Sequence, residues 1–396
     1  MTKQHNHQQT SATFAGRLLA WFECSGRHDL PWQQHKKAVA DVYAVWLSEI
    51  MLQQTQVATV MGYFNRFVQA LPTVHDLANA DWHVVADLWA GLGYYARARN
   101  LQAGAKQVVA FIQQHGRFPQ TVDEWQAIKG VGRSTAGAIV AMGVGGRGVI
   151  CDGNVKRVLT RHRAIADDIT KSATDKLLWQ LADTLTPNER SGHFAQAMMD
   201  LGATVCTRTK PKCGHCPVSG DCLAYRQNNP TAYPVKAKKR TKPSRHSLAL
   251  RIRYGDQVLW LKRAESQKSG IWEGLWCLPL LTVAQSTPVS LNTDDLIKQL
   301  NNSLSDDECL RWAQFAEQQL FCVLADLCSL YHTNVGQTIK HSLTHFYWHL
   351  TLMTIDIDDK LFTHINQALN ASQSTFVWQS WQTAIPAAMS KLLNGV

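Results

Sequence analysis

The chain has 396 residues, and its 40 Lys and Arg outnumber its 30 Asp and Glu, which gives a formal net charge of +10 at neutral pH. With 45% hydrophobic and 18% charged residues, it has an ordinary globular composition and is long enough for two or three domains with cores of their own. No apolar run reaches the roughly 18 residues that a membrane-spanning helix needs. Residues 1–9 show no signal-peptide pattern, so we expect a cytoplasmic protein. The excess of basic over acidic residues favours a polyanionic partner.

The first part of the chain, residues 14–227, has helical periodicity and no convincing strand, after a tail at residues 1–13 that we expect to be disordered. Residues 228–245 are rich in Pro, Lys and Arg and predict a linker, whose basic track either contacts an anion or is only a solvated tether. Residues 248–253 and 258–263 read as two strands joined by a turn, so residues 246–396 predict an α+β domain. The expected helices cover residues 42–71, 81–88, 96–115, 122–128, 134–142, 154–162, 172–184 and 194–206, after a first helix that ends near Leu30.

A glycine hairpin organises the helical part. Gly130 and Gly132 flank one apolar residue, and Ser134 then opens an Ala- and Ile-rich helix. The unpaired N–H groups at a helix start attract anions, and Lys129 and Arg133 stand beside them. This arrangement is typical of helix-hairpin-helix elements, which hold a DNA strand without reading its sequence. The alternative is a packing corner in which glycine serves only for steric reasons.

One carboxylate lies in an apolar helical stripe. Glu49 shares a helix face with Val45, Leu52 and Gln56. Removal from water raises the pKa of a carboxyl group and suits it to general-acid work. The alternative is a buried glutamate paired with an arginine, or one that reaches solvent.

A second carboxylate, Asp152, stands where a loop enters a helix, ahead of Gly153 and Asn154. Aspartate at that position is commonly just the N-cap of the helix. However, Asp152 follows the phosphate-binding helix along the chain, so it should stand near bound DNA. A pair of carboxyl groups in different surroundings can protonate a leaving group and stabilise positive charge on a sugar, which fits cleavage of an N-glycosidic bond.

Four cysteines within seventeen residues have the sharpest spacing in the sequence: Cys206, Cys213, Cys216 and Cys222. Such a set can hold either a [4Fe–4S] cluster or a structural zinc ion. The single Cys-x-x-Cys pair favours the cluster, because a zinc ribbon has two such pairs. The remaining cysteines have no grouping of this kind and read as small apolar residues.

Residues 91–100 combine flexible glycines with Tyr94, Tyr95, Arg97 and Arg99. This segment can stack on bases and hold phosphates, or it can be a helix start with tyrosines in the core.

Taken together, these motifs resemble the helix-hairpin-helix DNA glycosylases with an iron–sulfur cluster, and among them the MutY-type adenine DNA glycosylases. The resemblance covers residues 14–227, because residues 48–57, residues 91–100, the hairpin and the four cysteines follow the family's order. It implies an all-α glycosylase domain with a [4Fe–4S] cluster loop.

The resemblance also implies roles for single residues. Glu49 would protonate the adenine and then activate water, and Asp152 would stabilise the oxocarbenium-like sugar or attach to it transiently, with Asn154 in support. Gln54 and Tyr94 would wedge into the base stack, Thr55 would contact the opposite base, and Trp32 and Gln196 would line the adenine pocket. The expected DNA-contacting set is Trp32, Gln53, Gln54, Thr55, Tyr94, Arg97, Gly130, Gly132, Lys156, Gln196, Thr344 and His345.

One position separates the close relatives by chemistry. In the endonuclease III branch the residue after Gly-Val-Gly-Arg is a lysine that forms a Schiff base and nicks the strand. This chain has Ser134, which cannot form an imine, so we expect a glycosylase that uses water. The hairpin also has Ile128 and Lys129 where the family usually has Leu-Pro, which should loosen the turn and add a cation.

The C-terminal part resembles the MutT-like (Nudix-like) domain of the same family through residues 269–279. The acidic Mg²⁺-binding helix of true Nudix hydrolases should follow, but residues 280–285 lack its carboxylates, which argues against nucleotide hydrolysis. We expect this domain to inspect the base opposite the adenine. The family's Phe-Ser-His loop corresponds to Leu343, Thr344 and His345.

We therefore expect a monofunctional glycosylase that removes adenine mispaired with 8-oxoguanine or guanine, acting as a monomer on double-stranded DNA at the nucleoid. The alternatives are another mismatch or oxidised-base glycosylase of the endonuclease III branch, a non-catalytic DNA-binding module and, weakest, a metal-dependent nucleotide hydrolase.

Overall fold

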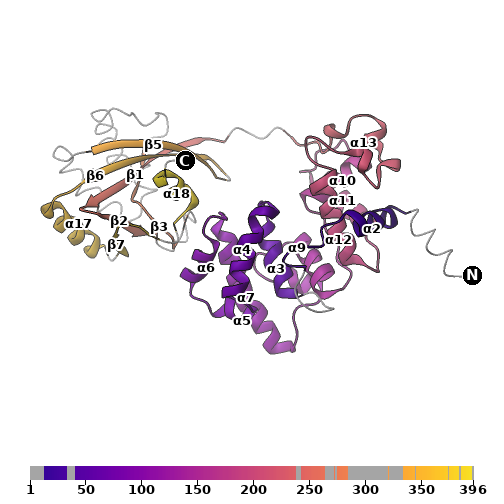
Figure 1. Ribbon diagram of the computed structural model, residues 1–396, viewed down its shortest axis with the longest axis horizontal. Coiled ribbons are helices and arrows are strands. Elements are labelled where there is room, and N and C mark those ends of the chain that lie inside the picture. Colours follow the sequence, from indigo (N-terminus) through magenta and orange to yellow (C-terminus); the bar gives the residue numbers. More distant parts are fainter. Residues whose placement is uncertain are drawn as a thin grey trace, which may run out of the picture. The chain divides into compact units, whose positions relative to one another are not determined.

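The computed structural model describes residues 13–33, 41–237, 242–263, 272, 274–283, 320, 333–343, 345–372, 374–382 and 385–394. The chain forms two compact units (Figure 1). The first contains Met1–Leu88 and Ala96–Lys239, and the second contains Trp89–Tyr95 and Arg240–Val396. No helix in the described ranges has the length and apolar character needed to cross a membrane.

The first unit is helical, as predicted, and residues 13–33 and 41–237 contain no strand. Two of its α-helices continue directly into a π-helical turn: α9 runs into η1, and α12 runs into η2. The helices and π turns are α2 (Phe14–Ser25), α3 (Val42–Leu52), α4 (Val57–Ala70), α5 (Val74–Asn79), α6 (Trp82–Trp89), α7 (Tyr95–His115), α8 (Val122–Gln126), α9 (Arg133–Ile139), η1 (Val140–Val144), α10 (Gly153–His162), α11 (Ser172–Leu185), α12 (Ser191–Asp200), η2 (Leu201–Val205) and α13 (Leu223–Arg226).

The largest differences from the prediction concern three places in the helical unit. The expected helix over residues 42–71 is broken into α3 and α4, because Gln54 has a φ of 59°, which no right-handed helix accommodates. The first helix ends at Ser25 and not near Leu30, and the Gly26 N–H bonds to the carbonyl of Phe22 there. The short helix α5 was not predicted, although its capping box of Thr73 and Asp76 marks its start in the sequence.

One hydrophobic core unites α2, α10, α11 and α12. It includes Leu18, Leu159, Leu178, Ala197 and Leu201, all fully buried. Burial of side chains of this size supplies roughly 1.5–3 kcal/mol each. This core fixes α10, which begins at Asp152, against α12, which carries Gln196.

Two glycines let α9 approach the extended segment that delivers Asp152. A Cβ atom on Gly137 would lie 2.0 Å from the carbonyl oxygen of Val149, and one on Gly148 would lie 2.0 Å from the carbonyl oxygen of Gly137. No larger residue fits at either position, so these glycines hold the hairpin helix and residues 148–152 at a fixed separation.

The second unit is an α+β fold, as predicted. Its sheet has the strand order β3-β2-β1-β6-β5, while β4 pairs with β1 and β7 pairs with β2. The β1–β6 pair is parallel and the other pairs are antiparallel. The strands are β1 (Ser244–Tyr254), β2 (Gln257–Lys262), β3 (Trp276–Cys277), β4 (Leu280–Val283), β5 (Thr333–Ser342), β6 (Tyr347–Asp356) and β7 (Phe376–Gln379).

Alternation along the strands places one core on each face of the sheet. Leu248 and Leu250 pack with α17 (Asp359–Ala371) on one face, whereas Ala249 and Trp260 pack with α18 (Ala387–Asn394) on the other. The predicted β1–β2 hairpin is present and turns at Gly255, whose φ is 60°. Residues 280–283, where the acidic metal-binding helix was missing from the sequence, form strand β4.

The predicted linker is largely attached to its neighbours. The N–H groups of Ile169 and Ala237 bond to the Val235 carbonyl oxygen at 3.1 Å and to an Asp168 carboxylate oxygen at 3.0 Å, respectively. At its other end, β1 already begins at Ser244. Of residues 228–245, only 238–241 lie outside the described residues.

Candidate active site and cysteine pocket

Glu49 lies on α3, a helix with almost no polar face. Its neighbours Trp46, Leu47, Ile50 and Met51 are buried, and Asp41 caps the helix start by accepting from two backbone N–H groups. The Glu49 side chain is surrounded by protein atoms yet keeps some access to solvent. Burial, and then the negative charge of Asp152, raise the pKa of Glu49 to about 8. Glu49 is therefore protonated at neutral pH.

Asp152 lies at the first turn of α10, where it is the N-cap. One carboxylate oxygen accepts from the Val155 N–H at 2.8 Å, and the other accepts from the Asn154 side-chain amide at 3.4 Å. Burial raises the pKa of Asp152, but these donors and the charge of Arg157 favour its ionised form. The N-cap role and the role as an anion thus use the same geometry, because the bonds that cap the helix also stabilise a negative charge on Asp152.

The two carboxyl groups are close enough for the charge of Asp152 to act on Glu49. They differ in surroundings as the sequence predicts. No hydrogen-bond donor offsets the raised pKa of Glu49, whereas groups on three residues, Val155, Asn154 and Arg157, favour the charge of Asp152. This arrangement can supply an acid and an anion at one place.

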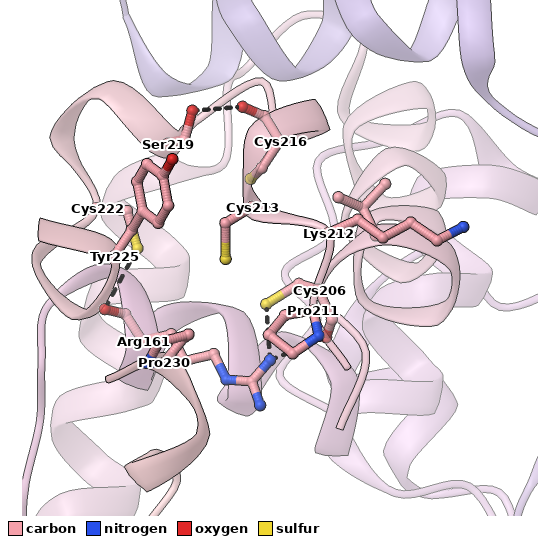
Figure 2. A pocket seen from close by; sticks show the side chains of 11 residues that line it. Arg161, Cys206, Pro211, Lys212, Cys213, Cys216, Ser219, Cys222, Tyr225 and Pro230 are labelled. Atoms are coloured by element: carbon pink, nitrogen blue, oxygen red, sulfur yellow. Dashed lines mark hydrogen bonds between the residues drawn. The ribbon is translucent and has the colours of Figure 1, made fainter. Parts of the chain in front are cut away.

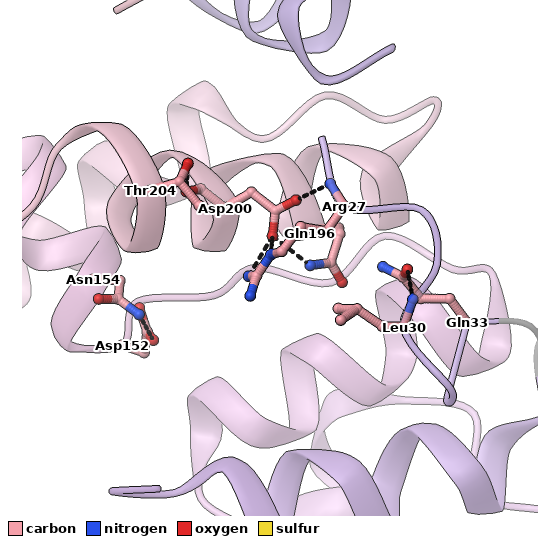
Figure 3. Close-up of polar contacts among 8 residues, drawn as sticks. All are labelled: Arg27, Leu30, Gln33, Asp152, Asn154, Gln196, Asp200 and Thr204. Carbon is pink, nitrogen blue, oxygen red and sulfur yellow. Dashed lines mark hydrogen bonds and ion pairs between the residues drawn. The ribbon is translucent and has the colours of Figure 1, made fainter. Parts of the chain in front are cut away.

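Gln196, on α12, belongs to a second group of polar contacts, which Figure 3 draws together with Asp152 and Asn154. The Gln196 amide nitrogen donates to Asp200 at 2.8 Å, and Asp200 also accepts from Arg27 through its backbone N–H at 2.7 Å and its guanidinium at 2.5 Å. Gln196 and Asp200 are buried, at 6% and 1% exposed. With its nitrogen directed to Asp200, the orientation of the Gln196 amide is fixed.

The sequence analysis missed Arg27 and Asp200. A signal existed for Asp200, since an acidic residue four positions after Gln196 shares its helix face. No comparable signal marks Arg27, which lies in the loop after α2 and meets Asp200 only through the fold.

The glycine hairpin has the predicted backbone. Gly130 has a φ of 85°, and a Cβ atom there would lie 2.8 Å from Cβ of Asn100. Gly132 is the N-cap of α9, with no side chain covering the first N–H groups. The helix thus begins one residue before Ser134. The Ser134 hydroxyl accepts from the Cys151 N–H at 3.0 Å and so connects the hairpin helix to the residue before Asp152.

The segment after α3 presents Gln54 on the surface. Gln54 is exposed and has a left-handed backbone conformation. Tyr94 has the same conformation, with a φ of 50°, and its side chain is 54% exposed. A non-glycine residue in this conformation costs about 1 kcal/mol or more, so such positions are seldom accidental. Gln53 is the C-cap of α3.

Arg97 bonds to the end of α3. Its guanidinium donates to the carbonyls of Ile50 and Met51 at 3.0 and 3.1 Å, to the carbonyl of Gln53, and to the Thr55 hydroxyl at 3.3 Å. These bonds satisfy the carbonyls at the end of α3. Arg97 therefore holds the segment that carries Gln54, and its expected contact with DNA stays a prediction.

The other predicted contact residues are placed as follows. Trp32 is buried, with its ring centroid 5.5 Å from that of Phe64. Lys156 forms an ion pair with Asp175. In the second unit, His345 is exposed, whereas Thr344 lies outside the described residues.

The four cysteines of the predicted cluster line one pocket, together with Arg161 and Tyr225 (Figure 2). All four are free thiols. Burial raises the pKa of Cys216 to about 12, and burial together with the neighbouring thiols raises the pKa values of Cys213 and Cys222. A positively charged centre in the pocket would reverse this effect and hold the thiolates.

The donor set fits an iron–sulfur cluster. Within the described part of the chain, no three His, Cys, Asp or Glu side chains converge on a single metal ion. A tetrahedral zinc would require such convergence, with Zn–S bonds of about 2.3 Å, whereas a cluster spreads its four ligands over a larger cube. The thiols of Cys206, Cys213, Cys216 and Cys222 would hold it.

Two arginines of α10 bond to the cysteine loop. Arg161, 2% exposed, donates to the carbonyls of Thr207, Arg208 and Tyr233 at 2.7 to 3.0 Å and to the Cys206 sulfur at 3.3 Å. Arg157 donates to the Cys206 carbonyl at 2.8 Å, and also to the Asn154 side-chain oxygen at 2.9 Å and the Gly202 carbonyl at 2.6 Å. Asn154 in turn donates to Asp152. Unbroken hydrogen bonds thus connect the cysteine loop with the carboxylate, and the sequence analysis did not identify either arginine.

Comparison with known families agrees with this geometry. Residues 47–184 match the HhH-GPD superfamily of base excision DNA repair proteins, and residues 206–222 match the iron–sulfur binding domain of endonuclease III. The second match begins and ends at cluster cysteines and decides between zinc and cluster: the cofactor is a [4Fe–4S] cluster.

Several relatives are adenine DNA glycosylases. That of Buchnera aphidicola subsp. Schizaphis graminum is 37% identical over 68% of this chain and 75% of its own length. That of Buchnera aphidicola subsp. Baizongia pistaciae is 35% identical over 75% of this chain and 84% of its own. The Homo sapiens enzyme is 48% identical over 53% of this chain and 39% of its own. The chain belongs to the adenine DNA glycosylase family.

Proposed function

We propose that this chain hydrolyses the N-glycosyl bond of adenine mispaired with 8-oxoguanine or guanine in double-stranded DNA, acting as a monomer and without nicking the strand. The observation that carries the proposal is the pair Glu49 and Asp152: burial and the charge of Asp152 keep the proton on Glu49, whereas Asp152 has hydrogen-bond donors and the charge of Arg157 to offset its burial. Extrusion of the adenine costs a few kcal/mol and is easier at a mispair. The left-handed, exposed Gln54 and Tyr94 are suited to fill the gap that the base leaves.

The chemistry follows from the two environments. Glu49 donates its proton to a ring nitrogen of the adenine, so that the bond between the sugar carbon and the base breaks with its electron pair going to the base. The Asp152 carboxylate stabilises the positive charge left on the sugar. Glu49, now ionised, takes a proton from water as the water oxygen bonds to the same carbon. When bound, the cluster holds the cysteine loop in its folded shape, and the residues above perform the reaction.

Ser134 limits the reaction to hydrolysis. Its hydroxyl cannot form an imine with the sugar, and it already accepts a hydrogen bond from Cys151. In the second unit, the tip of the β5–β6 hairpin at residues 343–346, where His345 is exposed, is the proposed reader of the opposite base. The N–H of Leu343 closes this tip by bonding to the carbonyl of Phe346 at 3.0 Å.

The test uses duplexes with adenine opposite 8-oxoguanine, guanine or thymine, each incubated with the cluster-loaded protein. Adenine release is followed directly, and strand breaks are counted before and after alkali. We expect release from the two mispairs and breaks only after alkali. Release of another base and not adenine would refute the substrate, equal release opposite thymine would refute the mispair preference, and breaks without alkali would refute the role of Ser134.

A further inference from the structure

The described acidic side chains of the second unit gather at one end of its sheet, where Arg253 pairs with Asp356. Every described acidic side chain of this unit lies where β1 and β6 end: Asp256, Asp356, Asp358 and Asp359. The opposite end, where β1 and β6 begin and β5 ends, carries Lys242, Arg245 and Lys340. Figure 1 shows β1 running from the linker side toward α17, so the two charged ends lie at opposite ends of the strands.

The basic end has an ordered face. Strand register places Ser244, Tyr347 and Ser342 in one row, with His246, His349 and Lys340 in the next. The imidazole rings of His246 and His349 stack with centroids 4.6 Å apart and planes 14° apart.

Two ammonium groups flank one aromatic ring on this face. Lys340 Nζ lies 4.0 Å from the ring centroid of Tyr347, and Lys242 Nζ lies 5.6 Å from it. Lys242 also donates to the carbonyl of Leu343 at 2.6 Å and so ties the start of this unit to the hairpin tip. Lys340 and Ser342 are exposed, and Tyr347 and Lys242 are half-buried. We call Lys242, Lys340, Ser342 and Tyr347 the basic face.

These groups fit a phosphate backbone. Ammonium and hydroxyl groups are common donors to phosphate oxygens, and an aromatic ring beneath them packs on a sugar. Among the described residues of this unit, the carboxylates that would compete for the ammonium groups stand at the far end of the strands. An acidic peptide carries irregularly spaced single charges, whereas a DNA strand carries a regular row of them.

We propose that the basic face binds the sugar–phosphate backbone of duplex DNA, beside the base-reading hairpin tip. This inference rests on the proposed function, from which it takes DNA as the partner. It assigns backbone binding to residues that the proposed function does not use. Backbone contacts position the protein and carry no sequence information. The basic face therefore contributes equally to affinity for every duplex, whichever base stands opposite the adenine.

The experiment measures binding of the full, cluster-loaded chain to labelled duplexes with adenine opposite 8-oxoguanine, guanine or thymine, over a series of salt concentrations. Lys242→Gln and Lys340→Gln remove one charge each and keep the side-chain stem. Each lost phosphate contact should reduce the slope of log affinity against log salt by about 0.9, and the double variant by about twice that. The reduction should be the same on all three duplexes.

Two controls are matched to these variants. Lys360→Gln removes an exposed lysine at the acidic end and should leave the slope unchanged. Lys340→Arg keeps the charge and should restore the slope that Lys340→Gln loses, which separates loss of charge from loss of folding.

The outcomes separate this inference from the proposed function. If the wild-type chain releases adenine while the Gln variants keep its slope, the basic face is wrong and the function stands. If the slopes fall as expected while the wild-type chain releases no adenine, the basic face stands and the function is wrong. A loss confined to one opposite base would also overturn the inference, because it would make the face a base reader.

Discussion

The end of α3 and the start of α10 carry the same functional group in opposite surroundings. Glu49 comes late in a helix whose neighbouring side chains are buried, and both burial and the charge of Asp152 act to keep its proton on. Asp152 stands at a helix start, where the Val155 N–H and the Asn154 amide donate to it. The difference between the two sites is in their donors, since burial raises the pKa of both groups.

This comparison shows how a helical scaffold assigns two roles to one kind of side chain. A helix interior has no spare N–H groups, so a carboxyl group there has no backbone donor. A helix start has several, and they stabilise negative charge. The position of each acid along its helix therefore decides which one gives up a proton and which one keeps its charge.

The most severe test of the comparison is Glu49→Gln, which keeps the shape of the side chain and removes the transferable proton. We expect the single-turnover rate of adenine release to fall by about 10²- to 10⁴-fold, which is the usual contribution of general acid–base catalysis. The same variant should be more stable than the wild type at alkaline pH, because an amide does not have to be ionised in a buried site.

The pH dependence of that stability has a definite sign. The folded pKa of about 8 lies above the ordinary glutamate value of 4.5, so the wild-type carboxyl stabilises the fold fully below pH 4.5 and loses this contribution as the pH rises through 8. The melting temperature of Glu49→Gln should thus match the wild type at pH 4.5 and exceed it by several degrees at pH 8.5. Glu189→Gln, at an exposed position in the loop before α12, is the control and should change neither rate nor melting temperature. Full activity of Glu49→Gln would instead favour a non-catalytic DNA-binding module.

Asp152→Asn tests the other side of the comparison. The Asn side-chain oxygen can still cap α10 by accepting from the Val155 N–H, so the melting temperature should change little. The negative charge beneath the sugar is lost, and we expect the rate to fall by roughly 10²- to 10³-fold, as for other single electrostatic groups in active sites. A variant that melts normally and reacts at the wild-type rate would show that the charge of Asp152 has no catalytic role.

The pH profile of the wild-type enzyme at DNA concentrations well below saturation reports the groups of the free enzyme, so it sharpens the assignment without any substitution. Glu49 must be protonated, so the rate should fall by about tenfold for each pH unit above about 8. Asp152 must be ionised, and its raised pKa should start the acid-side decrease at a higher pH than an exposed aspartate would. A rate that rises steadily to pH 10 would assign the acid to another group.

The local parts of this site were predictable from the sequence and the long-range parts were not. The apolar stripe around Glu49 and the helix start at Asp152 are patterns within one helix each, and the cysteine spacing lies within seventeen residues. In contrast, Arg27 and Asp200 are 173 positions apart, and the bond between Arg157 and the Cys206 carbonyl spans 49. Nothing in a single sequence indicates which distant partners the fold brings together.

Predicted helix ends were the least accurate local feature, for a related reason. The break between α3 and α4 depends on the left-handed backbone of Gln54 and on the Arg97 bonds to the carbonyls before it. The structural role of Arg97 was not predicted because its partners are backbone atoms, which every residue has. The same limitation hid the contacts of Arg161 to three carbonyls.

The smallest expected effect concerns the connection between the cysteine loop and Asp152. A Cβ atom on Gly202 would lie 2.7 Å from Cβ of Asn154, so Gly202→Ala must shift Asn154 or the π turn that precedes Cys206. Asn154 donates to Asp152, and its displacement should lower the rate by roughly threefold to tenfold, a loss of about 1 kcal/mol of hydrogen-bond energy. Gly220→Ala, in the same cysteine loop but with no atom within 4 Å of its added Cβ, is the matched control.

Iron content distinguishes the two explanations for a slow Gly202→Ala variant. If the rate falls while iron content stays equal to that of Gly220→Ala, the methyl group acts through Asn154 on Asp152. If iron is lost in proportion to activity, the substitution acts through the cluster loop, and Asn154 has no separate effect. In that second case the donors around Asp152 would be less important than the comparison with Glu49 requires, because displacement of Asn154 would not by itself lower the rate.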